Sequence, residues 1–575
     1  MLKKLARFVG KYKWLSIITP VIMMGEVFME IWIPKLMGSI INEGIWPGSL
    51  PAVLKYGGIM VAAAVISLLC GSLAAKTAAV ASAGFAANLR GALFHKIQDF
   101  SFANVDKFST ASLVTRSTTD VNNLRMCFQM CIRMLVRAPL MLVAGVFMAV
   151  SIDRELALVF VVAIPVLVTL LALVGRKAFP LFRAMLDKFD KLNAGIQENL
   201  TGIRVVKAFV KEADETEKFR AAADDVRSAQ VRAEKLLLLT SPGMMLSINA
   251  CILAVYWFGG RMIILGDLLP GDLISFISYV GQVLSSLMMI TMSFIMFTNG
   301  KASGDRVLAV LEEPIDITDA PGADIPVADG SIQFEDVCFS YTGDQGKLAL
   351  DHVDLSIRSG ETVGILGGTG CGKSTLVQMI PRLYDPLSGT VRVGGVDVKN
   401  YKLETLRTDV AMVLQKNTLF SGTILDNLRW GDNTATLEQV REACRAAAAD
   451  EFIMSFPKGY DTELGQGGVN LSGGQKQRLC IARALLKKPR IIILDDSTSA
   501  VDTATDARIR AAFREKLADT TTLIIAQRVS SVMDADRILV MDKGAVADMG
   551  THQELMARCR IYQEVYESQQ KGGEQ

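Results

Sequence analysis

The sequence predicts a multidomain protein in which an α-helical polytopic membrane domain precedes an α/β domain of the P-loop type. Long apolar runs fill the chain before about residue 300 and thin out afterwards. After residue 331, short runs rich in β-branched residues alternate with helical stretches. One of these runs leads into a glycine-rich loop at residues 367–374, and a helical stretch follows that loop.

Composition limits the possible functions. The 575 residues are 50% hydrophobic, which is high for a soluble protein, and the length allows two or more domains. The formal net charge of +2 gives no bulk field that would favour nucleic acid as a partner. The nine cysteines are scattered without CxxC spacing, which predicts reduced packing thiols rather than disulfides or metal ligands.

Six apolar segments are each long enough to cross about 30 Å of hydrocarbon at about 1.5 Å per residue. The first follows a basic start, but it is too long for a signal peptide and lacks a small-residue cleavage site, so we expect a retained helix. The segments span residues 14–42, 54–84, 129–151, 156–178, 239–264 and 270–298.

The connections between these segments alternate in length and charge. Three of them are short, at 44–53, 152–155 and 265–271, and Arg154 is their only basic residue. The stretches 86–128 and 180–238 are long and rich in Lys and Arg. The positive-inside rule therefore places the long stretches and both termini in the cytoplasm.

Two short polar segments interrupt the long inner stretches, at residues 102–113 and 198–209. Each is expected to form a short helix across the end of a helical hairpin, where it can dock on another domain. The alternative is a pair of capped hairpins without a partner.

Some residues of the membrane half are candidates for contact with cargo. Glu26 and Glu30 lie one helical turn apart, so they share a face, and carboxylates at membrane depth often face a wet interior. They could instead lie near the outer leaflet or pair with bases such as Lys35. Met292 and Met296 repeat at helical spacing and suit a surface that adapts to several ligands, although ordinary packing explains them as well.

A break in periodicity near residues 312–330, rich in Pro and Gly, predicts a linker. We therefore expect the membrane domain at 1–315, the linker at 316–330 and the α/β domain at 331–575. Strands are expected at 331–338, 353–357, 361–366, 410–414, 490–495 and 521–526.

The glycine-rich loop has the pattern that binds nucleotide phosphates. Its glycines allow backbone N–H groups to curl round the phosphates, Lys373 would reach the terminal phosphates, and the Ser374 hydroxyl would meet Mg²⁺. The apolar run that ends at Asp495 would deliver a second ligand for Mg²⁺. The expected ATP-binding residues of the loop are Gly367, Gly368, Thr369, Gly370, Cys371, Gly372, Lys373, Ser374 and Thr375.

A further motif, Leu471, Ser472, Gly473, Gly474 and Gln475, precedes a helical stretch. With this motif the chain resembles the ATP-binding cassette (ABC) family, and six helices ahead of one cassette resemble an exporter half-transporter. The resemblance implies that Tyr341 stacks on adenine and that Gln415 is the Q-loop residue, near the Mg²⁺ and the attacking water. It also implies that residues 499–502, including Ser499 and Asp502, form the D-loop, and that 102–113 and 198–209 are coupling helices.

The resemblance also implies pairing. In the family, two cassettes meet head to tail, and each ATP lies between one P-loop and the Leu-Ser-Gly-Gly-Gln motif of the other cassette. Residues 471–475 would therefore complete the partner's site, and one chain alone cannot form a complete site.

Two positions depart from the family pattern. Asp496 stands where a hydrolytic cassette carries the Glu that acts as general base, and Gln527 stands where it carries the switch His. Asp is one methylene shorter, and Gln can neither become cationic nor relay a proton. The pattern resembles the degenerate-site subunit of heterodimeric bacterial multidrug-type exporters, so the expected partner is a related but different half with the usual Glu and His.

The expected function is thus ATP-driven export across a bacterial-type plasma membrane, with ATP and Mg²⁺ as cofactors and a cytoplasmic ATPase domain. The cargo is an unspecified small molecule, lipid or peptide, and membrane lipid surrounds the helices. Two alternatives stay open: a homodimeric exporter or lipid flippase with slow hydrolysis, and a nucleotide-gated regulator.

Overall fold

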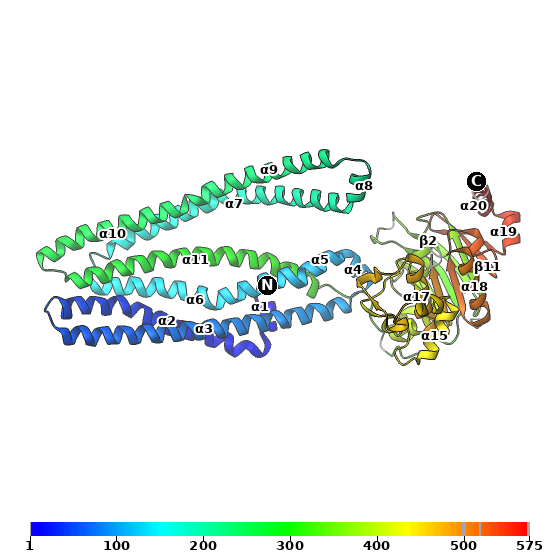
Figure 1. Ribbon diagram of the computed structural model, residues 1–575, viewed down its shortest axis with the longest axis horizontal. Helices are drawn as coiled ribbons and strands as arrows, with labels where there is room; N and C mark the ends of the chain where they lie inside the picture. Colours follow the sequence, from blue (N-terminus) through cyan, green and yellow to red (C-terminus); the bar gives the residue numbers. More distant parts are fainter. Residues whose placement is uncertain (1, 321, 345, 497–501, 517–518, 572–575) are drawn as a thin grey trace. The chain divides into compact units, whose positions relative to one another are not determined.

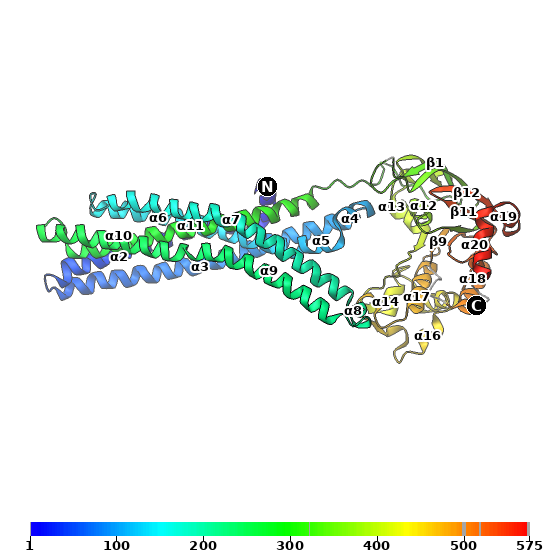
Figure 2. The ribbon, with the colours of Figure 1, turned by 90° about the horizontal axis from the view of Figure 1, so that it is seen from above.

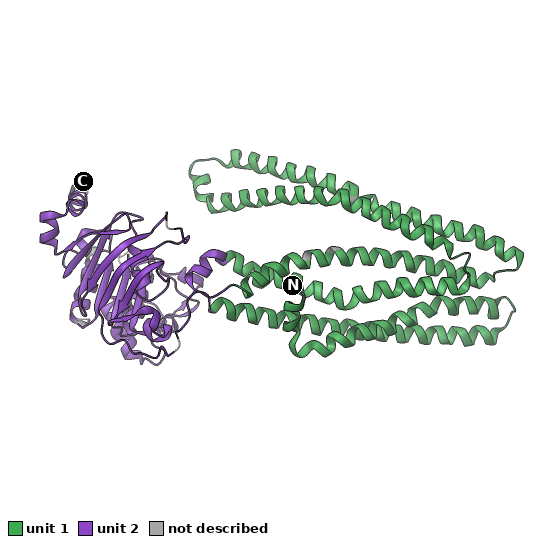
Figure 3. Cartoon of the chain, turned by 180° about the vertical axis from the view of Figure 1, so that it is seen from behind, with its two compact units in different colours: residues 1–98, 111–313 green, residues 99–110, 314–575 purple. Residues whose placement is uncertain are grey.

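The computed structural model describes residues 2–320, 322–344, 346–496, 502–516 and 519–571. The chain divides into two compact units, coloured separately in Figure 3. Unit 1 comprises residues 1–98 and 111–313, and unit 2 comprises 99–110 and 314–575. The short segment 99–110 thus groups with the cassette, although most of the membrane domain follows it in sequence.

Unit 1 consists of long helices (Figure 1), and six helical stretches of the described chain are long and apolar enough to cross a membrane. These stretches are Lys3–Ile45, Leu50–Gln98, Thr110–Ile152, Leu158–Thr201, Glu212–Leu265 and Pro270–Leu311. The helices are α1 (Leu2–Ala6), η1 (Arg7–Tyr12), α2 (Lys13–Ser39), η2 (Ile40–Ile45), α3 (Leu50–Gln98), α5 (Thr110–Thr115), η3 (Arg116–Asp120), α6 (Val121–Ile152), α7 (Leu158–Thr201), α8 (Ile203–Ala208), α9 (Glu212–Leu238), α10 (Thr240–Leu265) and α11 (Pro270–Leu311).

Local chemistry sets the ends of these helices. Gly266, with φ of +84°, ends α10, and Pro270 begins α11 four residues later, so a tight outer turn joins them. Ser101 caps α4 (Phe102–Phe108) through a capping box with Asn104, and Ser109 breaks the helix with φ of +57°. The two short helices expected at the inner ends are present as α4 and α8.

Helices α2 and α11 approach each other closely. A Cβ atom on Gly271 would lie 2.3 Å from the carbonyl oxygen of Gly38, so only glycine fits there. Below this contact, the Ser275 hydroxyl donates to the Pro34 carbonyl at 2.7 Å and the Tyr279 hydroxyl donates to the Ile31 carbonyl at 2.8 Å. These bonds satisfy polar groups that face an apolar core.

Unit 2 is built on a six-stranded sheet with strand order β12-β11-β3-β10-β9-β6 and a four-stranded antiparallel sheet with order β2-β1-β4-β5. In the larger sheet β12 pairs antiparallel with β11, and the remaining neighbours pair in parallel. The strands are β1 (Ile332–Phe339), β2 (Leu350–Ile357), β3 (Thr362–Gly367), β4 (Ser388–Val393), β5 (Val396–Asp397), β6 (Val410–Val413), β7 (Gly422–Thr423), β8 (Glu463–Leu464), β9 (Ile491–Asp495), β10 (Thr521–Ile525), β11 (Arg537–Asp542) and β12 (Ala545–Gly550).

The larger sheet is buried on both faces. Along β9, Ile491 and Ile493 belong to one core cluster, between the sheets, and Ile492 and Leu494 belong to another, beneath the helices. Figure 2 shows α14, α16 and α17 gathered on one side of unit 2, away from β1 and β12. The helices in the described parts of unit 2 are α4, α12 (Lys373–Met379), η4 (Val398–Asn400), α13 (Leu403–Asp409), α14 (Ile424–Leu428), α15 (Leu437–Ala446), α16 (Asp450–Met454), η5 (Gly459–Asp461), η6 (Gln466–Gly468), α17 (Gly473–Leu486), α18 (Thr503–Lys516), η7 (Val529–Ser531), α19 (His552–Arg558) and α20 (Arg560–Lys571).

The predicted fold class, six membrane-spanning helices followed by an α/β P-loop domain, is confirmed.

Candidate functional site

The glycine-rich loop forms an open cradle between β3 and α12. Gly372 has φ of +96°, and a Cβ there would lie 2.5 Å from the Ala349 carbonyl oxygen, so no other residue fits. A Cβ on Gly368 or Gly370 would meet no atom within 4 Å, so the mouth of the loop is open. Lys373 points back into this mouth, and its Nζ donates to the carbonyls of Gly367 and Gly368, each at 2.8 Å. The loop and the ammonium group together suit an anionic ligand such as a polyphosphate.

Next to the loop, a hydroxyl and a buried carboxylate are already in contact. The Ser374 Oγ donates to Asp495 Oδ1 at 3.0 Å, and Asp495 is only 3% exposed. Burial raises the pKa of Asp495 and the charge of Asp496 adds to this, whereas the Ser374 hydrogen bond opposes it. The Ser374 hydroxyl and the Asp495 carboxylate are oxygen donors of the kind that fits Mg²⁺.

Asp496, which follows β9, is held by glutamine side chains. The Gln527 Nε2 donates to Asp496 Oδ2 at 2.8 Å, and the Gln477 Nε2 donates to the Asp496 carbonyl at 3.2 Å. Burial raises the pKa of the Asp496 carboxyl group, while hydrogen bonds with Gln527 and Gln415 lower it. The structure therefore brings Asp496, Gln527 and Gln415 together, as the sequence predicts, and adds Gln477.

The Tyr341 side chain stands at the edge of the cradle. Its hydroxyl lies 2.9 Å from the Thr375 Oγ1, and its ring packs edge-on against Phe339 and Tyr384. More than half of Tyr341 is exposed (55%), so a planar ligand could stack on the open face of the ring.

The motif at 471–475 forms the start of α17. Ser472 is the N-cap: its Oγ accepts from the Gln475 backbone amide at 3.3 Å, and the Gln475 side chain accepts from the Ser472 amide at 2.9 Å. Leu471 is buried, whereas Ser472 and Gly473 are exposed and Gly474 is half-buried. Of the expected D-loop, Ser499 lies outside the described residues, and Asp502 accepts from the Thr505 amide at 2.9 Å.

In the membrane domain, Glu26 and Glu30 share one basic partner, Arg137 of α6. Arg137 forms an ion pair with Glu26 and another with Glu30, the second at 2.7 Å. Lys35 is not the partner of either. Sequence reasoning missed Arg137, although an arginine inside an apolar segment is itself a signal of function. Met292 is exposed, and Met296 lines a narrow crevice between α6 and α11 together with Met130 and Ser293.

Within unit 2, α4 docks on the cassette beside Tyr341. The Tyr384 hydroxyl donates to Asp106 Oδ2 at 2.7 Å, and the Phe102 ring packs edge-on against the Tyr384 ring at 5.9 Å. The Asn104 Nδ2 donates to the Pro314 carbonyl at 3.1 Å. The sequence predicted a docking helix here but did not identify Tyr384, because nothing in the local pattern marks it.

Comparison with known proteins places this geometry in a family. The model of the ABC transporter transmembrane region matches residues 15–287, and the ABC transporter model matches residues 350–499. The uncharacterized ABC transporter ATP-binding protein YfiB of Bacillus subtilis is 39% identical over 568 residues, which cover 99% of this chain and 98% of that protein. A fatty acid ABC transporter ATP-binding/permease protein of Mycobacterium bovis is 36% identical over 82% of this chain and 75% of its own length. The solved structure of a bacterial Atm1-family ABC exporter with ATP bound superposes with a TM-score of 0.79, at 25% identity and 98% coverage of both chains.

Proposed function

The chain belongs to the ABC transporter family as an exporter half-transporter, and from this we infer that it is the weakly hydrolysing half of a heterodimeric exporter. The family makes it a multi-pass membrane protein whose cytoplasmic ATPase drives export, and ABC exporters act as dimers. The proposal concerns which of the two ATP sites performs hydrolysis.

One observation carries the proposal: the Gln527 amide donates to the Asp496 carboxylate at 2.8 Å. A general base must reach the attacking water, and a displacement of about 1 Å can cost about 10²-fold in rate. Asp496 is one methylene shorter than Glu, and the amide occupies one of its oxygens. Gln527 cannot carry a positive charge or relay a proton. The pair thus suits holding ATP better than cleaving it.

The remaining residues fit ATP binding without hydrolysis. Lys373 and the loop amides would hold the phosphates, Tyr341 would hold the adenine, and Ser374, Asp495 and Gln415 would hold Mg²⁺. When bound, Mg²⁺ would neutralise charge on the phosphates. Ser472 and Gly474 would complete the partner's site, where the cycle is driven.

Restoring the two missing groups tests the proposal. We expect the purified chain alone to bind ATP but turn it over slowly, whereas the double variant Asp496→Glu, Gln527→His should hydrolyse ATP at least about tenfold faster as a homodimer. The matched control carries Lys373→Ala in addition and should lose ATP binding.

Two results would favour the alternatives. Turnover by the lone wild-type chain equal to that of the two-chain complex would support a homodimeric exporter or flippase. Ion currents that continue without hydrolysis would support a nucleotide-gated regulator.

For the cargo, we propose an acidic amphiphile, because one basic side chain of α6 lacks a counter-ion. In the described parts of the chain Arg133 has no hydrogen-bond or ion-pair partner, and its Nε is buried. It lies one turn from Arg137 on a face that also carries Arg125 and Gln129, at four-residue spacing. An unpaired guanidinium at membrane depth is costly unless it meets an anion. A relative named for fatty acid transport agrees with this cargo class.

Three fluorescent amphiphiles with the same alkyl tail, carrying a carboxylate, an amide or a quaternary ammonium head, can decide the cargo charge. In vesicles of zwitterionic lipid we expect the complex to export the carboxylate best, Arg133→Gln to remove this preference and Arg133→Lys to retain it. The complex could instead export the ammonium probe best and lose this preference in the double variant Glu26→Gln, Glu30→Gln. That result would assign the acidic pair to cationic cargo.

A further inference from the structure

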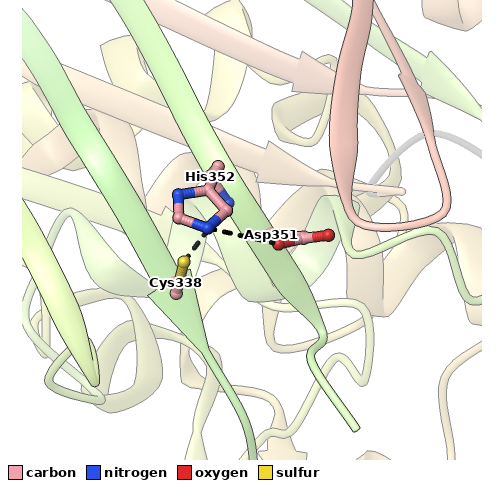
Figure 4. A group of neighbouring side chains, drawn as sticks. All are labelled: Cys338, Asp351 and His352. Carbon is pink, nitrogen blue, oxygen red and sulfur yellow. Dashed lines mark hydrogen bonds and ion pairs between the residues drawn. The ribbon is translucent and has the colours of Figure 1, made fainter. Parts of the chain in front are cut away.

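A β-bulge brings three side chains that can bind a metal together on the neighbouring strands β1 and β2. The register of β1 and β2 leaves Cys338 on β1 opposite two residues of β2, Asp351 and His352. One donor atom from each of these three residues lies within 4.8 Å of the others. The backbone N–H of His352 donates to the Cys338 Sγ at 3.3 Å, and the His352 Nε2 lies 4.0 Å from Asp351 Oδ1 (Figure 4). The donor set therefore comprises a thiol, an imidazole and a carboxylate.

The backbone is bent to achieve this arrangement. Consecutive side chains of a regular strand point to opposite faces of the sheet, so Asp351 and His352 would not both reach Cys338. His352 adopts φ of +45° and Asp336, across the strand pair, adopts φ of +51°, a region unfavourable for residues other than glycine. Such a backbone persists where the surrounding structure holds it, and it clusters at functional positions.

A fourth residue orients the imidazole. The Nδ1 of His352 lies 2.5 Å from Asp336 Oδ1, which leaves Nε2 available on the side of Asp351, 4.0 Å from its Oδ1. Metal-binding histidines commonly donate their other ring N–H to a carboxylate in this way. The carboxylates of Asp336, Asp351 and Asp354 place negative charge near the imidazole, which favours a metal cation.

We propose that Cys338, His352 and Asp351 bind Zn²⁺, with Asp336 as a positioning residue. A sulfur, a nitrogen and an oxygen donor suit tetrahedral Zn²⁺, and water would take the fourth position. Cys338 is buried while Asp351 and His352 are exposed, so that position opens to solvent. Zn–ligand bonds of about 2.0 to 2.3 Å need donors roughly 3.5 Å apart, so the three side chains would have to move closer together when Zn²⁺ binds. Binding converts the Cys338 thiol to a thiolate and releases one proton.

Cobalt titration of the purified full-length chain in detergent tests the site directly. Co²⁺ should bind one per chain and give a thiolate-to-cobalt charge-transfer band with the strong d–d bands of tetrahedral cobalt, and Zn²⁺ should displace it. Cys338→Ser and His352→Gln should abolish the band. Asp336→Asn should keep one site but weaken it about 10- to 100-fold. Cys70→Ser and His95→Gln make the same chemical changes elsewhere and should leave the titration unchanged.

ATP binding, measured on every variant, shows which ones are folded. If Cys338→Ser fails to fold, the exposed His352→Gln and Asp336→Asn variants still carry the test. A wild-type titration without the charge-transfer band would overturn the proposal. A band that persists in His352→Gln, or that disappears in Cys70→Ser, would also overturn it. Zn²⁺ should raise the unfolding temperature of the wild type but not of His352→Gln, because a ligand stabilises only the form that binds it.

Discussion

At the scale of single residues, the nucleotide site combines parts that suit ATP binding with parts that suit hydrolysis poorly. Lys373 and Ser374 already point at the places a phosphate and its metal would take, bonded to loop carbonyls and to Asp495. Asp496 and Gln527 instead bond to each other. Motif matching alone would miss this poor fit to hydrolysis, because Asp496 and Gln527 leave the motifs recognisable and change only their chemistry.

Cys371 provides a chemical test of the loop. Cys371 is 6% exposed, and its Sγ lies 3.7 Å from the Lys373 Nζ, within the proposed phosphate loop. A maleimide adduct there should abolish nucleotide binding, because the loop has no room for a bulky group on the inner side. Bound ATP should slow the labelling. The measurement is ATP affinity after labelling, with Cys371→Ala as the control that stays active under the reagent. Normal affinity in the fully labelled protein would contradict the loop geometry.

The ion pair between Glu361 and Arg537 makes stability depend on pH. Burial alone would raise the pKa of Glu361, but hydrogen bonds from Arg537 and the Arg358 amide outweigh it and hold the pKa below its usual value. A carboxyl group with a lowered pKa adds stability above about pH 4.3, and this stability is lost as pH falls through the folded-state pKa. Glu361→Gln should therefore lower the unfolding midpoint at pH 7 and approach the wild type below pH 3.

The control for that experiment is Glu335→Gln, which breaks the more exposed pair with Arg392 at 3.2 Å. Exposed pairs contribute about 0 to 1 kcal/mol, so its midpoint should hardly move at any pH. Equal pH profiles for the two variants would show that the Glu361 pair is no stronger than an exposed one.

At the scale of elements, α4 groups with the cassette unit, although it lies within the membrane half of the sequence. Its Asp106 accepts from Tyr384, whose ring contacts both Phe102 and Tyr341. Helix α4 and Tyr341, the residue expected to stack on adenine, thus share Tyr384 as a neighbour. A change at the nucleotide can reach α4 through packed side chains, without a long connection.

Replacing Tyr384 by Phe tests this route, since it keeps the ring and removes the bond to Asp106. A hydrogen bond to a charged group contributes about 1.5 to 3 kcal/mol, so we expect transport per ATP hydrolysed to fall about tenfold while ATP affinity changes little. Tyr401→Phe is the matched control, because it loses a buried hydrogen bond to the Val393 carbonyl at 2.8 Å rather than a bond to α4. Equal effects of the two variants on coupling would rule out a special role for Tyr384.

The sequence predicted the membrane helices better than the strands of the cassette. Long apolar runs identified all six membrane helices because few other structures accommodate so many consecutive apolar residues. Strands β4, β5, β7, β8, β11 and β12 were not predicted. Of these, Ser388–Val393 and Ala545–Gly550 are short and partly polar, and they pair with β1 and β11 in the folded chain. The contact between Arg137 and the acidic pair depends in the same way on helices that meet only in the folded chain.

At the scale of the whole molecule, this chain would supply half of each of two different ATP sites in the proposed heterodimer. Its P-loop, with Asp496 and Gln527, would belong to one site, and Ser472 and Gly473, which are exposed at the start of α17, would complete the other. Mutations in the two halves should therefore have unequal effects in a heterodimer and equal effects in a homodimer.

The proposed asymmetry of the two sites can be tested by the ATPase activity of variants in the native two-chain complex. If the first site only holds nucleotide, Asp496→Asn removes little chemistry and should leave ATPase activity within about twofold. Gly474→Val should reduce it more than about 100-fold, because a side chain at the start of α17 blocks backbone approach to the γ-phosphate of the partner's ATP. The ATPase rate of each variant complex, measured beside ATP occupancy, gives the answer. In a homodimer Asp496 is the only carboxylate at the base position of either site. If Asp496→Asn lost as much ATPase activity as Gly474→Val, this chain would therefore hydrolyse ATP itself.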